Sequence, residues 1–178
     1  MLTDKQAAQY FHRCYTAVDG LWFMKVEEKH GFEAALEADH QVWKVLPKIQ
    51  ARMLKAMLNA DRGIDALREC LTTKLALEEF DFETRKTVDG FNILVNRCPW
   101  HDQLVKSGRE HLANIVGRRI CGTEYPVWAA EFGDIQFVLQ QQICEGCGQC
   151  VLRFSQNVVQ AVETPAAPPP NKTLTGLP

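Results

Sequence analysis

The sequence DIQFVLQQQICEGCGQCVLRF, residues 134–154, combines a strand pattern with a cysteine-rich turn. In its first part Ile135 and Phe137 alternate with polar residues, which is typical of a half-buried β-strand. A second apolar run, residues 151–154, follows the Gly-containing segment 145–149, which we interpret as a hairpin turn. The tip of this predicted hairpin carries a C-x2-C-x2-C run: Cys144, Cys147 and Cys150.

The first half of the chain has apolar residues at helical spacing. Thr3 and Gln6 have the spacing of a capping box, and Gly31 is a stop signal. A second helix with a kink at Pro47 and a third over residues 61–79 are expected to follow. We expect the apolar set of the first helix to face the core: Ala7, Phe11, Cys14, Val18, Leu21 and Trp22.

In the second half of the chain the spacing of the apolar residues changes. Residues 91–96 alternate and stop before Pro99, so we predict a strand there, and we predict helices over residues 101–118 and 121–132. The expected fold class is α+β: a helical N-terminal half packed on a small antiparallel sheet, with a C-terminal β-hairpin and two intervening helices. One domain is expected over residues 1–160, followed by a Pro-rich flexible tail over 161–178.

The composition argues against several classes of function. The 178 residues are 46% hydrophobic and 24% charged, with a net charge of −2, and no basic block suggests nucleic acid. No apolar run is long enough to span a membrane, and residues 1–6 lack the layout of a secretory signal. We therefore expect a cytoplasmic protein with no nucleic-acid or membrane partner, in which seven cysteines are thiols or ligands rather than disulfides.

The cysteine triplet calls for a fourth ligand from elsewhere in the chain. Cys98 precedes a proline, and Cys121 lies at the start of a predicted helix, whose N-terminus would favour a thiolate. Thiolates without histidine suit a [4Fe–4S] cluster or zinc, and the spacing fits zinc knuckles less well. The alternatives are that Cys98 and Cys121 are small buried hydrophobes, or that one cysteine is a nucleophile. Cys14 and Cys70 are expected in the core.

Three polar residues are candidates for catalysis beside this site. His101 follows Cys98 closely and could protonate a substrate, although a solvated helix-start residue is the ordinary interpretation. Asp39 lies between two apolar positions of its helix and should face inward, where a carboxylate without a partner is costly. The ordinary interpretation is that it pairs with an arginine or lies at the edge of the apolar stripe. Glu124, three residues after Cys121, either faces the same cavity or complements the helix dipole.

The segment from Arg97 to Phe154 resembles the C-terminal part of the aminothiazoline-carboxylate hydrolase family and is similar to vinyl-reductase-type ligand-binding domains. The helical first half looks like that of small uncharacterised cysteine-rich proteins of anaerobes. The residues that carry these resemblances are Cys98-Pro99, Gly108-Arg109, Cys121-Gly-Thr-Glu-Tyr125, Trp128, the run Ile143–Phe154 and, in the first half, Val18-Asp-Gly-Leu-Trp22-Phe.

The resemblance implies an α+β domain in which Cys98, Cys121, Cys144 and Cys150 converge, and Cys147 is additional to the family's turn. The hydrolases of the family open a ring that contains sulfur and nitrogen. We therefore expect one oxygen-sensitive [4Fe–4S] cluster, held by four of the five cysteines, beneath a small-molecule pocket. A metal-free cysteine hydrolase and a zinc-binding or ligand-sensing module stay open. A small-molecule ligand or a redox partner is expected, and a homodimer is not excluded.

Overall fold

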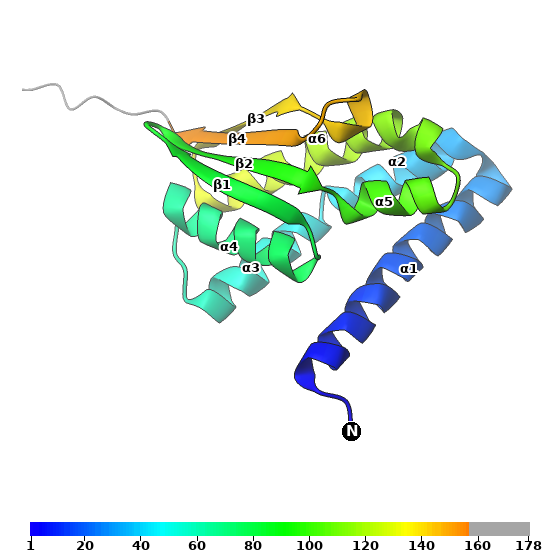
Figure 1. The fold of residues 1–178 in the computed structure, drawn as a ribbon, viewed down its shortest axis with the longest axis horizontal. Coiled ribbons are helices and arrows are strands. Elements are labelled where there is room, and N and C mark those ends of the chain that lie inside the picture. Colours follow the sequence, from blue (N-terminus) through cyan, green and yellow to red (C-terminus); the bar gives the residue numbers. More distant parts are fainter. Residues whose placement is uncertain (157–178) are drawn as a thin grey trace, which may run out of the picture.

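A four-stranded antiparallel sheet with helices on one side forms the framework of the molecule (Figure 1). The computed structural model describes residues 1–156. The strand order is β1-β2-β4-β3, so β4, the last strand in the chain, lies between β2 and β3. The elements are α1 (Asp4–His30), α2 (Phe32–Trp43), α3 (Leu46–Leu58), α4 (Ile64–Leu77), β1 (Asp81–Thr87), β2 (Gly90–Arg97), α5 (Pro99–Lys106), η1 (Glu110–Leu112), α6 (Ala113–Phe132), β3 (Ile135–Gln141), η2 (Ile143–Glu145) and β4 (Cys150–Gln156).

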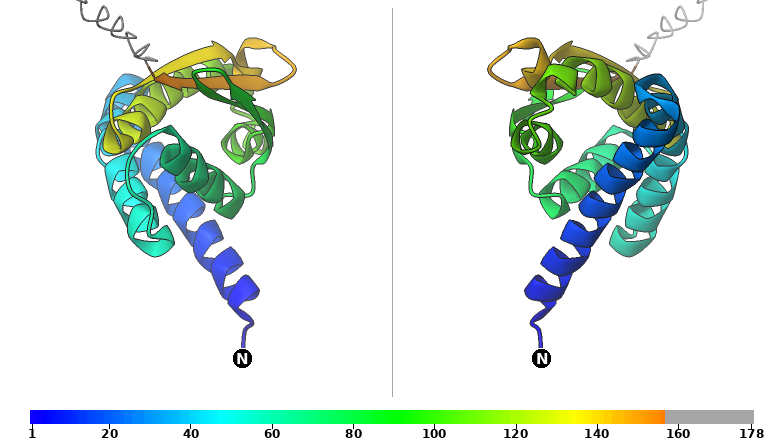
Figure 2. Two further views of the ribbon diagram at one scale, coloured as in Figure 1. Left: turned by 90° about the vertical axis from the view of Figure 1, so that its left-hand side faces the viewer. Right: turned by 90° about the vertical axis from the view of Figure 1, so that its right-hand side faces the viewer.

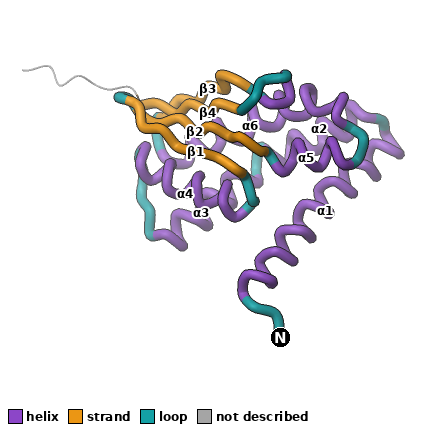
Figure 3. Tube along the Cα trace, in the orientation of Figure 1, coloured by secondary structure: helices purple, strands orange, loops and turns teal. Residues whose placement is uncertain are grey.

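The predicted α+β class and the C-terminal hairpin are confirmed. β3 and β4 pair antiparallel, with Phe137 opposite Phe154, and β4 also pairs with β2. The sheet is covered on one side by α4 and α6, as the ribbon and tube views show (Figures 2 and 3). Between these layers lies the core, in which the rings of Phe91 and Phe154 stack at 5.0 Å and Trp128 is fully buried.

Some of the helix ends lie where the sequence predicts them, and others do not. The Thr3–Gln6 capping box is present, and Gly31 ends α1 at a φ of 85°. The second predicted helix is instead two helices, α2 and α3, because the chain turns at Lys44–Val45 and Pro47 sits in the first turn of α3. A proline is tolerated there, since that N–H has no helical partner.

Two expectations for the later helices are wrong. The chain breaks after Lys106, where Gly108 has a φ of 70°, and α6 then runs unbroken to Phe132. Cys121 therefore lies in the middle of α6, far from the N-terminal turn that was expected to favour its thiolate. The edge strand β1 was not predicted, because its sequence DFETRKT is mostly polar and exposed.

The outer side of α1 also differs from its prediction. Phe11, Val18, Leu21 and Trp22 were expected in the core, but each is more than half exposed, and Cys14 is exposed as well. The N-terminal half of α1 projects away from the rest of the described chain (Figures 1 and 2). Cys70, by contrast, is buried in the core as expected.

No helix within residues 1–156 combines the length and the apolar character needed to cross a lipid bilayer. The segment 161–178, predicted as a tail, and residues 157–160 lie outside the described residues.

Candidate functional site

Four cysteines from four separate places in the chain line one cavity of about 120 Å³. Cys98 is the residue before α5, Cys121 is in mid-α6, Cys144 is in η2 and Cys150 opens β4. These are the four residues whose convergence the family resemblance implied. Cys147, in the loop between η2 and β4, does not line the cavity. We call this space the cysteine cavity.

Sheet register brings two of the thiols together. Cys150 pairs with Val95 on β2, and β2 ends at Arg97, so Cys98 follows directly at the same end of the sheet. Pro99 then begins α5 and turns the chain away from the strand direction. The long-range pairing of β2 with β4 and the proline-started helix therefore place Cys98 and Cys150 at the same end of the sheet.

The inward face of α6 supplies the opposite wall. Cys121 follows Gly117 by four residues, and Glu124 and Tyr125 follow Cys121 by three and four, so all four lie on one face and line the cavity. Gly117 lies so near η2 that an added Cβ would be 2.9 Å from Cys144 Sγ. The absence of a side chain at this position lets the hairpin loop rest against α6.

All four thiols have raised pKa values, and burial is the main cause. The pKa of Cys98 rises to about 12, and that of Cys121 rises well above its ordinary value through burial and the neighbouring Cys98. Burial also raises the pKa of Cys144 and of Cys150, although the Ile143 N–H donates a hydrogen bond to Cys150 Sγ at 3.3 Å. No lysine or arginine of the described chain lines the cavity. Lys74 and Arg118 oppose the rise for Cys98 and Cys144 without cancelling it, and a metal cation bound among the sulfurs would favour their thiolate forms.

A buried charge cluster adjoins the cavity. Lys74 Nζ lies 2.5 Å from Glu124 Oε1 and 2.9 Å from Glu78 Oε2, and all three side chains are buried. Burial disfavours the charge of Lys74, but Glu124 and Glu78 outweigh it and hold its pKa above the ordinary value. Burial raises the pKa of Glu124, with Glu78 adding and Lys74 opposing. Two buried carboxylates therefore share one buried cation.

The other two candidate catalytic residues also line the cavity. His101 is in the first turn of α5, and Asp39 comes from α2. Burial, and then the nearby Asp19 of α1, raise the pKa of Asp39 to about 7, while the indole of Trp43 opposes the shift. Burial and Glu78 raise the pKa of Asp19 to about 6. The structure thus brings His101, Asp39 and Glu124 to the same space as the four thiols.

A second space, which we call the outer chamber, meets the cysteine cavity at the two aspartates. It has a volume of about 430 Å³ and lies between α1 and α5. Asp19, Asp39 and Trp100 belong to the walls of both spaces. The Trp100 ring stands edge-on to the rings of Tyr15 and Trp43, each at 5.8 Å between centroids. Aromatic packing therefore holds the wall where the two spaces meet.

Several features of the site were not predicted correctly. Glu124 cannot complement a helix terminus, because it lies in mid-α6 and pairs with Lys74. Lys74 and Gly117 were missed as site residues. The available signal for Lys74 was its place between Leu71 and Leu75, a charge on an apolar helix face with a glutamate four residues later.

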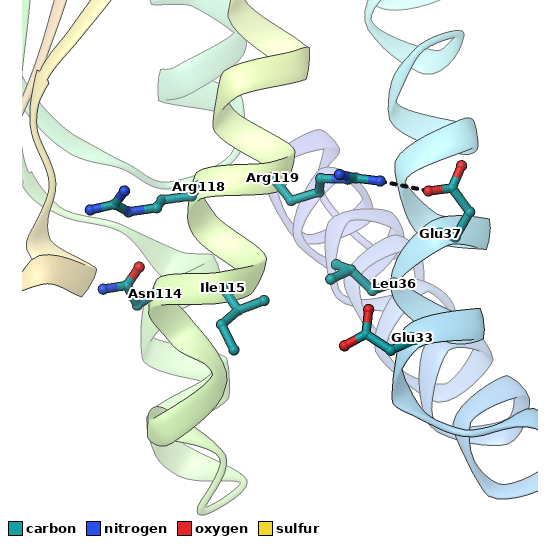
Figure 4. A pocket seen from close by; sticks show the side chains of 7 residues that line it. All are labelled: Glu33, Leu36, Glu37, Asn114, Ile115, Arg118 and Arg119. Carbon is teal, nitrogen blue, oxygen red and sulfur yellow. Dashed lines mark hydrogen bonds and ion pairs between the residues drawn. The ribbon is translucent and has the colours of Figure 1, made fainter.

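A larger groove on the surface, between α2 and α6, has a different character (Figure 4). Arg119 reaches across it to pair with Glu37 at 2.6 Å, while Arg118 points to the other side of α6, where it pairs with Glu145. The groove contains no cysteine, and its ion pair is about half exposed. We therefore assign no chemistry to it.

Fold and site together define a cysteine-rich α+β protein in which four thiols share an internal cavity next to a larger chamber. Residues 6–135 match the family described as "Family of unknown function (DUF6125)", and the chain belongs to this family. Neither a curated protein nor a solved structure was found to match the chain. The family match covers Cys98 and Cys121 and ends before the hairpin loop that carries the other three cysteines.

Proposed function

We propose that this protein is a cytoplasmic iron–sulfur protein in which Cys98, Cys121, Cys144 and Cys150 hold one [4Fe–4S] cluster. The observation that carries the proposal is that these four thiols, from four separate places in the chain, line one cavity. Four thiolates are the usual ligands of such a cluster. The Ile143 N–H donates a hydrogen bond to Cys150 Sγ, and Gly117 lies close to Cys144. Contacts of this kind orient the ligands of a bound group.

The arrangement of the side chains argues against a single zinc ion. Within residues 1–156, no three or more Cys, His, Asp or Glu side chains are close enough together to hold a single metal ion. Zinc, with Zn–S distances of about 2.3 Å, would require four sulfurs within about 4 Å of one another. A four-iron cluster is a larger body and holds its ligands farther apart. A cavity of about 120 Å³ is also smaller than the roughly 300 Å³ at which pockets for organic ligands begin.

The thiol environment argues against a metal-free cysteine hydrolase. A nucleophilic cysteine needs a lowered pKa, which a neighbouring cation or a helix N-terminus supplies. Here the pKa of Cys98 is raised to about 12, and Cys121 lies in mid-helix. Thiols with raised pKa values are weak nucleophiles, whereas a bound metal would replace their protons.

The outer chamber is the proposed place for a small molecule, in keeping with its volume of about 430 Å³. A bound cluster would supply electron transfer or an iron that acts as a Lewis acid. Asp39 and His101 stand at the wall of the cysteine cavity, where they could hold or deliver a proton to a ligand. Glu124 would be fixed by Lys74. The substrate class that the family resemblance suggests is a small sulfur- or nitrogen-containing compound, acted on as by a lyase or hydrolase.

Anaerobic purification of cysteine variants tests the ligand set. Cys98→Ala, Cys121→Ala, Cys144→Ala and Cys150→Ala should each lose the brown colour and most of the iron. Cys147→Ala is the matched control, since it lies in the same loop but outside the cavity, and Cys70→Ala controls for a buried core thiol. Both controls should keep the iron. Full iron retention in any two of the first four variants, or its loss in Cys147→Ala alone, would contradict the assignment.

A further inference from the structure

One exposed side of α1 is apolar, and Leu21 lies at its edge, where α1 borders the outer chamber. Phe11, Val18, Leu21 and Trp22 are exposed by 57 to 68% of their surface, and Cys14 is exposed between them. We call these five residues the outer stripe. Scattered exposed hydrophobic residues are normal, but a contiguous apolar patch marks a binding surface.

The spacing of the outer stripe is that of a coiled-coil seam. Phe11 and Val18 are seven residues apart, and so are Cys14 and Leu21, which is the a/d repeat by which two helices pack along their length. The opposite side of α1 packs on the body through residues such as Thr16, which is buried. α1 therefore presents one side to its own chain and an unpartnered seam to the outside.

We propose that the outer stripe binds the outer stripe of a second copy of this chain, with the two α1 helices antiparallel. The charges at the two ends of the stripe specify this orientation. Asp4 and Lys29 are both exposed on the same side of α1 as the stripe, one at each end. An antiparallel pair that sets Phe11 opposite Trp22 of the second copy also sets Asp4 opposite Lys29. A parallel pair would place like charges together at both ends.

The extent of the surface fits a modest two-fold dimer. A helix of 27 residues is about 40 Å long and about 10 Å across, so one half of its surface offers on the order of 600 Å². A standard interface buries about 800 Å² on each partner. A symmetric pair uses the same patch on both copies, so no second complementary surface is required.

The oligomeric state of the full chain tests the proposal. Sedimentation equilibrium should give twice the chain mass of 20.2 kDa for the wild type. Val18→Glu, a charge in the middle of the seam, should raise the dissociation constant at least about tenfold. Val88→Glu is the matched control, because Val88 is fully exposed in the turn after β1, and it should leave the dimer intact. A monomeric wild type, or a dimer indifferent to Val18→Glu, would overturn the proposal.

A charge exchange tests the orientation without altering the apolar stripe. Asp4→Lys should weaken the dimer by opposing Lys29 of the second copy, and the double variant Asp4→Lys/Lys29→Asp should restore it. If the double variant is as weak as the single one, the antiparallel arrangement is wrong. Iron content is measured on the same samples, so failure of the dimer and failure of the cluster are told apart.

Discussion

Gly117 and Cys144 are in such close contact that a Cβ on the glycine would be 2.9 Å from the sulfur. Real Cβ atoms do not approach other atoms so closely, so a larger residue at position 117 must push the Cys144 sulfur aside. We predict that Gly117→Ala lowers the iron content per chain, because the Cys144 sulfur turns away from its position facing α6. Iron analysis after anaerobic purification measures this effect.

Gly122 is the matched control in the same helix, since nothing lies within 4 Å of its added Cβ. Gly122→Ala should keep the iron and stabilise α6 by up to about 1 kcal/mol, the difference in helix propensity between alanine and glycine. Equal iron content in the two variants would show that the contact of Gly117 with Cys144 does not position the thiol.

The buried cluster around Lys74 gives a prediction for stability. Lys74→Met leaves Glu78 and Glu124 buried without a cation and should lower the free energy of unfolding by about 3–5 kcal/mol. Adding Glu124→Gln should recover part of the loss. Urea titration measures the free energy of unfolding of each variant. Arg85→Met, which breaks an exposed pair with Glu83, is the control and should cost less than about 1 kcal/mol. A similar small cost for Lys74→Met would mean that the charges are not buried as described.

Asp39 gives a prediction for pH. Its pKa of about 7 in the folded protein lies above the ordinary 3.8, so the folded state keeps a proton that the unfolded chain has already lost. Stability should therefore fall as the pH rises through the window between these two values. Asp39→Asn should reduce this fall in the free energy of unfolding. The reduction over the whole window is at most about 2 kcal/mol after allowance for solvent screening. Denaturation at several pH values measures it.

The control for the pH experiment is Asp134→Asn, a change at an exposed position between α6 and β3. This variant should keep the slope of the wild type. Part of the slope should survive in Asp39→Asn as well, because Asp19 has a pKa raised to about 6. An unchanged slope in Asp39→Asn would show that this carboxylate titrates normally.

The sequence predicted some elements well and others poorly for clear physical reasons. The hairpin was predictable because Ile135 and Phe137 alternate with polar residues before a Gly-containing turn, and β4 follows. The strand β1 was not predictable, since an exposed edge strand has few apolar residues to mark it. For α1 the periodicity correctly grouped Phe11, Val18 and Trp22 on one side, but periodicity does not reveal what covers that side.

The site was predictable in its residue types and not in its geometry. Spacing alone placed Cys144, Cys147 and Cys150 together, and the family resemblance implied that Cys147 is the additional one; in the structure it lies outside the cavity. The role of α6 could not be predicted, because the helix break was placed next to Cys121 instead of at Gly108. That error also hid the contact of Gly117 with the hairpin loop.

The most direct test of the cluster proposal is the ratio of iron and acid-labile sulfide to protein, measured on full-length wild-type chain that has never been exposed to air. The proposal predicts about four irons and about four sulfides per chain, with all four cavity thiols protected from alkylation. One zinc per chain without sulfide, or metal-free protein whose cavity thiols react freely, would contradict it.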